Sequence, residues 1–375
     1  MTTQRVIALL GRRDAPTDAV EEYCRYLGGA LGAHEISIEL RRVPWDSLGW
    51  PESLKGLRLQ AQSLPPGTWF LVQYTALAWS VRGFPLRFLH VLKTLRSSKA
   101  CVAVVFHDVE PFPGLRLVDR FRRSVQLWVM RRAVALSDRG IFTVPMEKIS
   151  WLAAESHNAT FIPVGPNLPI PLPAPIDAAP SSAFLSRAPS VAVFGVTGGA
   201  EGVVESQKVL AAVRAASGKL GRLGLSVFGR NADSAGLVLR EGLRDLPVEF
   251  SVEGVLQECQ VVEKLSSCDV LLFVRGAISS RRSSAIAGIA CGLPVIAWSG
   301  TETAPPITDA GVVFVAQSKD SSESQEFLNA ALIRVLSDSA YRAELAARSR
   351  AAYLEHFSWP SVATRFAVVL NSSTR

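Results

Sequence analysis

The stretch CDVLLFVRGAISSRRSSAIAGIACGLPVIAW, residues 268–298, decides the fold class of this chain. Its pattern predicts a buried strand at 270–274, a basic loop at 275–283, a helix of small residues at 284–291 and a second strand at 295–298. Two strands joined through a helix form a parallel βαβ unit. The loop therefore leaves the carboxyl end of a strand and enters a helix N-terminus, where backbone N–H groups favour an anion.

The loop is also rich in hydroxyl and guanidinium groups, which bind phosphate oxygens well. We interpret it as a binding site for a diphosphate. The alternative is an ordinary loop that these polar side chains merely solvate. The residues that carry the interpretation are Arg275, Ser279, Ser280, Arg281, Arg282, Ser283 and Ser284.

The composition indicates a globular chain. Of its 375 residues, 48% are hydrophobic and 19% are charged, which suits about two domains with ample cores. No apolar run approaches the roughly 18 residues that span a bilayer, and the first residues carry charge where a signal peptide would need its cleavage region. We expect a cytoplasmic protein, soluble or peripheral on the inner face of the cell membrane.

Charge and cysteine usage narrow the class of partner. The net charge of +7 suggests an anionic partner. The five cysteines and five histidines are dispersed, without the paired spacing of a zinc site or a disulfide framework, so we predict no metal site. Nucleic acid is disfavoured as a partner because the basic residues lack interleaved aromatic side chains for base stacking.

The first half of the chain alternates strands with helices, which predicts a doubly wound parallel sheet. Its first strand leads into a loop that contains Arg12, Arg13, Thr17 and Asp18. Asp18 suits the N-cap of the following helix, and Glu21, three residues on, would complete a capping box. Strands are expected at 5–10, 36–40, 68–73 and 100–106, and helices from Asp18 onward and at 52–62 and 86–96.

His107 and Asp108 follow the strand at 100–106, at the carboxyl end where such sheets bind ligands. The alternative for His107 is a histidine that only caps the strand end. Asp108 could serve as a general base.

Residues 115–134 predict an amphipathic helix with an apolar face and an arginine face. The apolar face either packs on the sheet above a solvated arginine face, or the arginines meet anionic lipid headgroups. The apolar face comprises Val118, Phe121, Val125, Trp128 and Val129, and the arginine face Arg116, Arg120, Arg123 and Arg131.

The proline-rich segment 163–190 is typical of an interdomain linker. In the half that follows, three expected strands each end at a loop containing glycine, which suits close backbone contact with a ligand. These strands, at 191–194, 225–228 and 248–252, lead respectively into Gly195 and Thr197, Gly229 and Arg230, and Gly254 and Val255.

The order of these parts resembles the GT-B glycosyltransferases, especially the retaining family 4 and its relatives. The segments that carry the resemblance are ACGLPVIA at 290–297, HD at 107–108, PVGPNLP at 163–169 and FSWPSVA at 357–363. The resemblance implies an α/β fold of two Rossmann-like domains with an interdomain cleft and a C-terminal helix that crosses back. The implied parts are an acceptor-side domain at 1–165, a linker at 166–190, a nucleotide-sugar domain at 191–355 and a crossover helix at 356–375.

The resemblance also implies a nucleoside diphosphate sugar as co-substrate, with no other cofactor and no metal. Donor contacts would come from the basic loop together with Gly195, Thr197, Gly229, Arg230, Gly254 and Val255. His107 would approach the donor sugar, and Asp108 would be the base if the enzyme inverts. Arg12, Arg13, Thr17 and Asp18 would form the acceptor-side loop, and the arginines of 115–134 would face a membrane.

Two departures from the family pattern matter. The glutamate pair of retaining members corresponds here to Ser279 and Ala287, and the usual basic pair corresponds roughly to Val196 and Glu201. We therefore expect the diphosphate charge to be met by other cations, namely Arg275, Arg281 and Arg282, with Arg230 and Lys208 behind them.

The sequence thus favours a hexose-type glycosyltransferase that acts on a glycan or lipid-linked acceptor at the cytoplasmic membrane face. Two alternatives remain at this stage. One is a catalytically silent GT-B protein within a polysaccharide assembly complex, and the other is a nucleotide-sugar epimerase.

Overall fold

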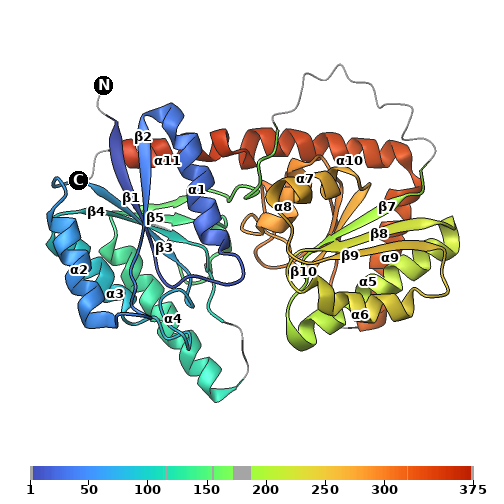
Figure 1. Ribbon diagram of the computed structural model, residues 1–375, viewed down its shortest axis with the longest axis horizontal. Coiled ribbons are helices and arrows are strands. Elements are labelled where there is room, and N and C mark those ends of the chain that lie inside the picture. The colour runs from blue at the N-terminus through green and yellow to red at the C-terminus, as the bar shows by residue number, and fades with distance from the viewer. Residues whose placement is uncertain are drawn as a thin grey trace. The chain divides into compact units, whose positions relative to one another are not determined.

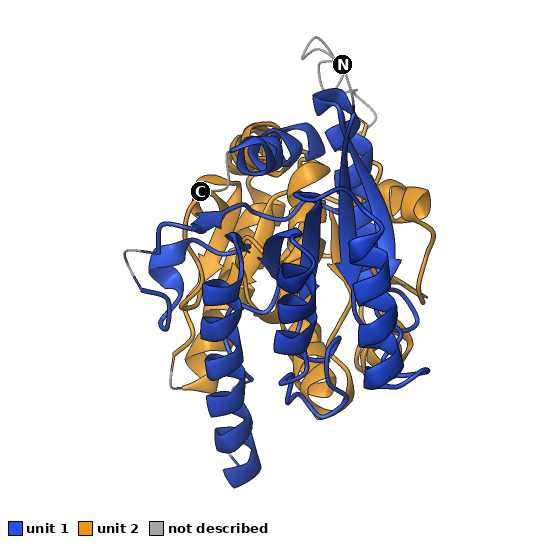
Figure 2. Cartoon of the chain, turned by 90° about the vertical axis from the view of Figure 1, so that its left-hand side faces the viewer, with its two compact units in different colours: residues 1–167, 359–375 blue, residues 168–358 orange. Residues whose placement is uncertain are grey.

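The computed structural model describes residues 3–112, 114, 116–153, 156–171, 187–318 and 320–372. The chain forms two compact units, residues 1–167 with 359–375 and residues 168–358 (Figure 2). Most of the predicted linker, residues 172–186, lies outside the described part. The last helix, α11 (Trp359–Asn371), belongs to the first unit although it follows the second in the chain.

The first unit is built on a six-stranded parallel sheet of order β2-β1-β3-β4-β5-β6. Helices α1 and α11 pack together on one face, and α2, α3 and α4 form the layer on the other (Figure 1). The elements are β1 (Gln4–Leu10), α1 (Ala19–Leu31), β2 (Ile36–Arg42), α2 (Trp50–Gln62), β3 (Trp69–Tyr74), α3 (Phe88–Ser97), β4 (Cys101–Phe106), α4 (Leu117–Leu136), β5 (Arg139–Phe142) and β6 (Ala159–Phe161).

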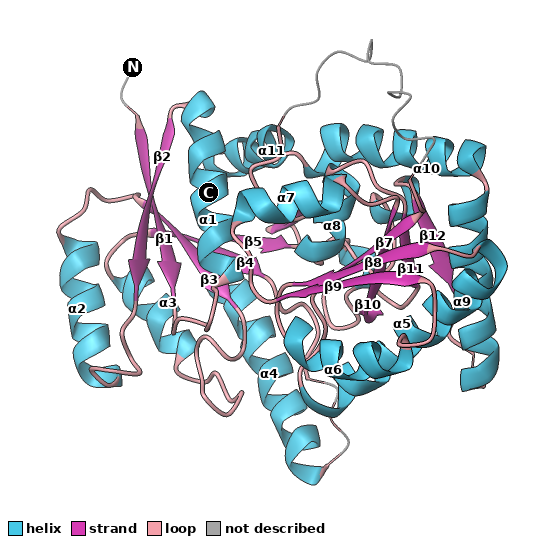
Figure 3. Cartoon of the chain, turned by 45° about the vertical axis from the view of Figure 1, so that its right-hand side comes forward, coloured by secondary structure: helices cyan, strands magenta, loops and turns pink. Residues whose placement is uncertain are grey.

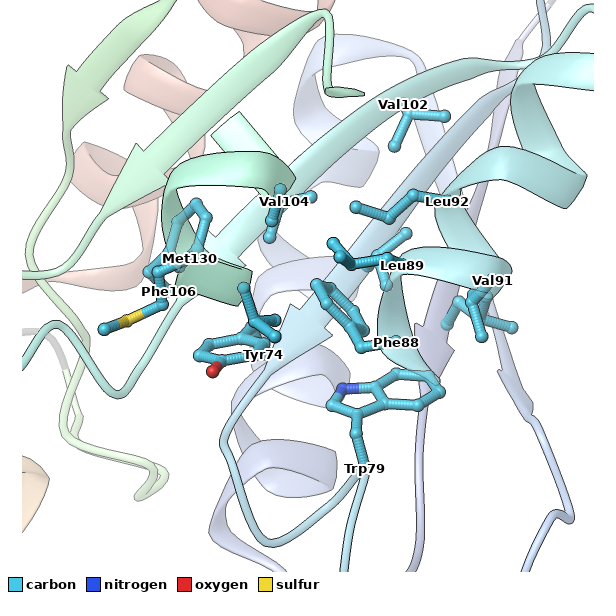
Figure 4. Close-up of a cluster of buried hydrophobic side chains, with 14 of the residues drawn as sticks. Tyr74, Trp79, Phe88, Leu89, Val91, Leu92, Val102, Val104, Phe106 and Met130 are labelled. Atoms are coloured by element: carbon cyan, nitrogen blue, oxygen red, sulfur yellow. The ribbon is translucent and has the colours of Figure 1, made fainter. Parts of the chain in front are cut away.

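Large aromatic side chains fill the core beneath the carboxyl half of this sheet (Figure 4). Tyr74 and Trp79 both pack against Phe88 of α3, with ring centroids 5.0 and 5.1 Å away. The indole Nε1 of Trp79 donates to the carbonyl oxygen of Gln73 at 2.8 Å, so the loop after β3 is fixed to the strand it leaves. This fixed loop supplies one wall of the candidate site described below.

The second unit has its own six-stranded parallel sheet, of order β12-β11-β10-β7-β8-β9 (Figure 3). Helices α5, α6 and α9 lie on one side, and α7, α8 and α10 on the other (Figure 1). The elements are β7 (Ser190–Phe194), α5 (Gly199–Leu220), β8 (Leu223–Phe228), α6 (Ala232–Gly242), β9 (Val248–Glu253), α7 (Glu258–Ser266), β10 (Val270–Ala277), α8 (Ser283–Ala290), β11 (Val295–Trp298), β12 (Val312–Val315), α9 (Ser321–Ser337) and α10 (Ser339–Ala352).

Each sheet has a topological switch point, where successive connections run to opposite sides. It lies between β1 and β3 in the first unit and between β7 and β10 in the second. Parallel sheets bind ligands in the crevice beyond the strand ends at such points. The fold therefore directs attention to the loops after these four strands.

The expected doubly wound α/β architecture is confirmed in both units. The predicted apolar face of α4 packs on the core only in part. Val125 and Val129 contact it, whereas Val118, Phe121 and Trp128 are 48%, 65% and 49% exposed. The buried side of α4 also carries polar groups that hold neighbouring loops. Asp119 binds Arg122 at 2.6 Å, and the Gln126 amide bonds the backbone of Phe112 and Gly83 at 2.8 Å each.

Candidate functional site

The loop after β7 is held tightly by neighbouring segments. The N–H of Gly195 donates to the carbonyl oxygen of Phe228 at 2.7 Å, and the N–H of Val196 donates to that of Arg230 at 3.1 Å. The buried carboxylate of Glu205, on α5, accepts from both the N–H and the hydroxyl of Thr197 at 2.7 Å each. The loop therefore presents a preformed backbone at the switch point.

Arg275 lies beside this loop from the adjacent strand β10. Glycine suits position 195 for two reasons. A Cβ atom there would lie 3.3 Å from Nη1 of Arg275, and the backbone has a φ of +73°, which other residues rarely adopt. Burial lowers the pKa of Arg275, and the charge of Arg230 acts in the same direction while that of Glu205 opposes it. Within the described residues, the Arg275 guanidinium has no hydrogen bond or ion pair.

Arg281, by contrast, forms an ion pair with a carboxylate. Its Nε and Nη2 donate to the two oxygens of Glu302 at 2.7 and 3.0 Å, and the buried Ser279 hydroxyl donates to the same group at 3.1 Å. Burial raises the pKa of Glu302, but the bonds and charge of Arg281 outweigh it and hold that pKa below its usual value. The sequence analysis did not select Glu302. The feature that could have indicated a site residue is its position shortly after β11, at the carboxyl end of the strand.

The rest of the predicted donor residues occupy the same edge of the second sheet. Gly229, with a φ of +94°, donates its N–H to the carbonyl oxygen of Gly254 at 2.9 Å, which joins the ends of β8 and β9. Val255 follows with its side chain 51% exposed. Ser279 and Ser280 are buried, Arg282 is the N-cap residue of α8, and Ser283 and Ser284 form its first turn.

In the first unit, His107 and Asp108 stand directly after β4. Nε2 of His107 lies 2.8 Å from Oε1 of Gln73, and the imidazole meets the ring of Tyr23 edge to face at 5.0 Å. An oxygen of Asp108 accepts the N–H of Ala76 at 2.8 Å. Both side chains are thus held by residues of other elements.

A pocket of about 250 Å³ lies at the β1–β3 switch point. Its wall combines the predicted acceptor-side residues Arg12, Arg13 and Asp18 with Arg42 and Asp108, whereas Thr17 is not part of the lining. Asp18 is the N-cap of α1: one oxygen accepts from the N–H groups of Val20 and Glu21 at 3.1 Å, and the other from Arg42 at 2.7 Å. Glu21, expected to complete a capping box, pairs its carboxylate with Arg42.

The four predicted membrane-facing arginines are exposed: Arg116 at the N-cap of α4, and Arg120, Arg123 and Arg131 on the helix. Exposed apolar side chains accompany them on the helix and on the loop between β3 and α3. The loop and the helix are joined, because Arg122 donates to the carbonyl oxygen of Arg82 at 3.0 Å and Phe84 packs on Phe121. The exposed apolar residues of this surface are Leu77, Val81, Leu86, Leu117, Val118, Phe121 and Trp128.

The described residues include no cluster of three or more histidine, cysteine, aspartate or glutamate side chains that could hold a metal ion. Among the helices that the structure describes, none combines the length and the apolar character needed to cross a bilayer.

Two Rossmann-like units, with the last helix returning to the first unit, place this chain in the GT-B fold class. No model of a known protein family matches the sequence, and no curated protein matches it. Solved structures do match over nearly the whole chain, at identities that establish the fold alone.

One of these is Anabaena HepE in complex with UDP and glucose, with 14% identity and a TM-score of 0.63 over 99% of this chain and 100% of that one. Another is sucrose-phosphate synthase from Thermosynechococcus elongatus, with 18% identity and a TM-score of 0.65 over 98% of each. A third is a UDP-N-acetylglucosamine 2-epimerase homologue from Listeria monocytogenes, with 11% identity and a TM-score of 0.62 over 99% of this chain and 96% of that one.

Proposed function

We propose that this chain is a glycosyltransferase that moves a sugar from a nucleoside diphosphate donor to a glycan or lipid-linked acceptor at the cytoplasmic face of a membrane. The observation that carries the proposal is Arg275, a half-buried guanidinium with no hydrogen bond or ion pair in the described structure, at the switch point of the second sheet. An anionic ligand there would offset the burial of this charge. Complexes of a structural neighbour with UDP support a nucleoside diphosphate as the anionic ligand.

In this proposal Arg275 and Arg230 meet the donor diphosphate, with the glycine backbone of the loop after β7 close by. Arg281 has a different task, because Glu302 already neutralises it and the pair fixes the loop that enters α8. Because the Ser279 hydroxyl donates to Glu302, a carboxylate lies beside the residue that corresponds, by the resemblance, to one glutamate of the retaining family. Glu302 is therefore our candidate for a donor-sugar contact supplied from a different strand end.

Catalysis would rest on orienting the two substrates and on stabilising the leaving diphosphate with fixed cations. His107 is the candidate contact to the donor sugar. Asp108 is a candidate base, and its bond to Ala76 holds one carboxylate oxygen while the carboxylate lines the unit 1 pocket. The pocket with Arg12 and Arg13 is the candidate acceptor site.

The experiment that tests the activity is incubation of the protein with a panel of nucleotide sugars, with and without a bacterial lipid extract, followed by mass spectrometry. A transferase releases nucleoside diphosphate and forms a glycosylated lipid or glycan only when the extract is present. An epimerase, the activity named for one structural neighbour, would isomerise the donor without any acceptor. A silent binding protein, favoured by Ser279 and Ala287 in place of the glutamate pair, would do neither.

The surface of α4 and the loop before α3 supports the membrane part of the proposal. Arginines attract anionic headgroups by roughly 1 kcal/mol each, and exposed apolar side chains on the same helix add binding when they enter the acyl boundary. The charge and the apolar exposure of this surface complement an anionic bilayer.

Flotation with phosphatidylglycerol and phosphatidylcholine vesicles tests the membrane surface. We expect binding to anionic vesicles that weakens in high salt and falls at least tenfold in a Phe121→Ser/Trp128→Ser double variant. Leu59→Ser is the control, because Leu59 is 62% exposed, close to the 65% of Phe121, but lies on α2. Equal binding by the control and the double variant would refute this role of α4.

A further inference from the structure

Gln73 is an amide side chain buried at the end of an otherwise apolar strand. Every residue of β3 is buried, and Gln73 is 1% exposed. Burying an amide costs free energy unless both its donor and its acceptor are satisfied. The partners of Gln73 therefore show what this polar residue does in the core.

Both ends of the amide are used, and their roles can be assigned. Nε2 of Gln73 donates to the carbonyl oxygen of Leu71 at 3.2 Å, which fixes the orientation of the amide. Oε1 then faces Nε2 of His107 at 2.8 Å. Because an amide oxygen can only accept, Nε2 of His107 carries the proton of this bond.

The ring of His107 is also restrained from another element. Tyr23, on α1, meets it edge to face with an interplanar angle of 86°. The backbone of His107 is tied to β3 as well, through its N–H to the carbonyl oxygen of Tyr74 at 3.0 Å. Gln73 therefore acts on a ring whose position is set and decides which nitrogen holds the proton.

We propose that Gln73 is a positioning residue that keeps the proton of neutral His107 on Nε2, so that Nδ1 is the basic nitrogen of the ring. This rests on the proposed role of His107 beside the donor sugar. A neutral imidazole of this tautomer is an acceptor at Nδ1, toward a donor such as a sugar hydroxyl, while its Nε2 donates to Gln73.

Nitrogen-15 NMR of the full chain tests the tautomer independently of activity. The His107 signals are assigned with His107→Asn. We expect an Nε2-bound proton, protected from exchange, in the wild type and in Gln73→Glu, which keeps an acceptor oxygen. Gln73→Leu is expected to lose that protection. A proton on Nδ1, or unchanged protection in Gln73→Leu, would overturn the proposal.

Thr143→Val is the structural control. Thr143 is buried directly after β5, the strand beside β4, and its hydroxyl donates to the carbonyl oxygen of Phe106, one residue before His107. The variant loses this buried hydrogen bond but keeps Gln73, so the Nε2 proton of His107 is expected to stay protected. If Thr143→Val also loses protection of the Nε2 proton, a general loosening of the core around His107 explains the result for Gln73→Leu. That outcome would count against the proposal.

Turnover separates this inference from the proposed function. Gln73→Leu is expected to lower kcat for a donor at least tenfold with KM changed less than about twofold, and Gln73→Glu to recover part of kcat. Unchanged kcat together with a confirmed tautomer would refute the positioning role and leave the tautomer assignment standing. Absence of donor turnover in the wild type would count against the proposed function, not against the tautomer.

Discussion

At the residue scale, the candidate donor site divides its arginines between two tasks. Arg281 is bound at both ends of its guanidinium by Glu302, whereas Arg275 lies at the switch point without such a partner in the described residues. The sequence analysis selected both arginines as phosphate ligands, because the residue type alone does not show which guanidinium is already paired. It could not separate them, since Glu302 is 21 residues away from Arg281 and lies after a different strand.

Glu302→Gln tests the structural task of the Arg281–Glu302 pair. We expect a loss of about 1–3 kcal/mol in the free energy of unfolding at pH 7, because the variant leaves a mostly buried guanidinium without its carboxylate. Urea unfolding measures the difference.

The pH dependence of this loss follows from the lowered pKa of Glu302. A carboxyl group with a lower pKa in the folded chain stabilises it above the unfolded pKa, near 4.5, and loses that effect as pH falls through the folded pKa. The difference in the free energy of unfolding between wild type and Glu302→Gln is therefore expected to disappear below about pH 4.5. A gap that stays constant down to the folded pKa would argue against the ion pair as its source.

At the element scale, the strands were predictable because parallel strands buried on both faces appear as continuous apolar runs. The N-cap of α1 was predictable too, because Asp18 precedes a helical pattern and its side chain serves local N–H groups. The packing of α4 was not, since periodicity locates an apolar stripe without showing what covers it. Asp119 and Gln126 are buried there through loops that the pattern of the helix does not contain.

Asp18→Ala tests the element that forms the wall of the first-unit pocket. We expect the free energy of unfolding to fall by about 1–2 kcal/mol, because the variant loses both the helix cap and the contact with Arg42. Asp18→Asn, which keeps a capping oxygen, is expected to lose less. Chemical denaturation of both variants gives the comparison, and equal losses would show that the charge, not the cap, dominates.

At the scale of the whole molecule, the sequence predicts two doubly wound sheets from the order of its parts, and the structure confirms them. The place where the loops after β7 and β10 lie side by side was also predictable, because it is the switch point of a doubly wound sheet. The contacts formed there depend on side chains far apart in the chain, such as Gln73 with His107 and Ser279 with Glu302. No local pattern could have supplied them.

The central claim, that the second unit binds a nucleoside diphosphate through Arg275, is tested most directly by thermal denaturation with UDP, GDP, ADP, dTDP and their common sugars. A ligand that binds only the folded state at 100 times its Kd stabilises it by about 2.7 kcal/mol and raises Tm. The control is Arg222→Ala, because Arg222 belongs to the same unit but precedes β8 at the amino edge of the sheet, paired with exposed Glu249. We predict that one nucleotide class raises the Tm of the wild type and of Arg222→Ala, and that this rise is lost in Arg275→Ala. No rise with any nucleotide, or an undiminished rise in Arg275→Ala, would contradict the claim.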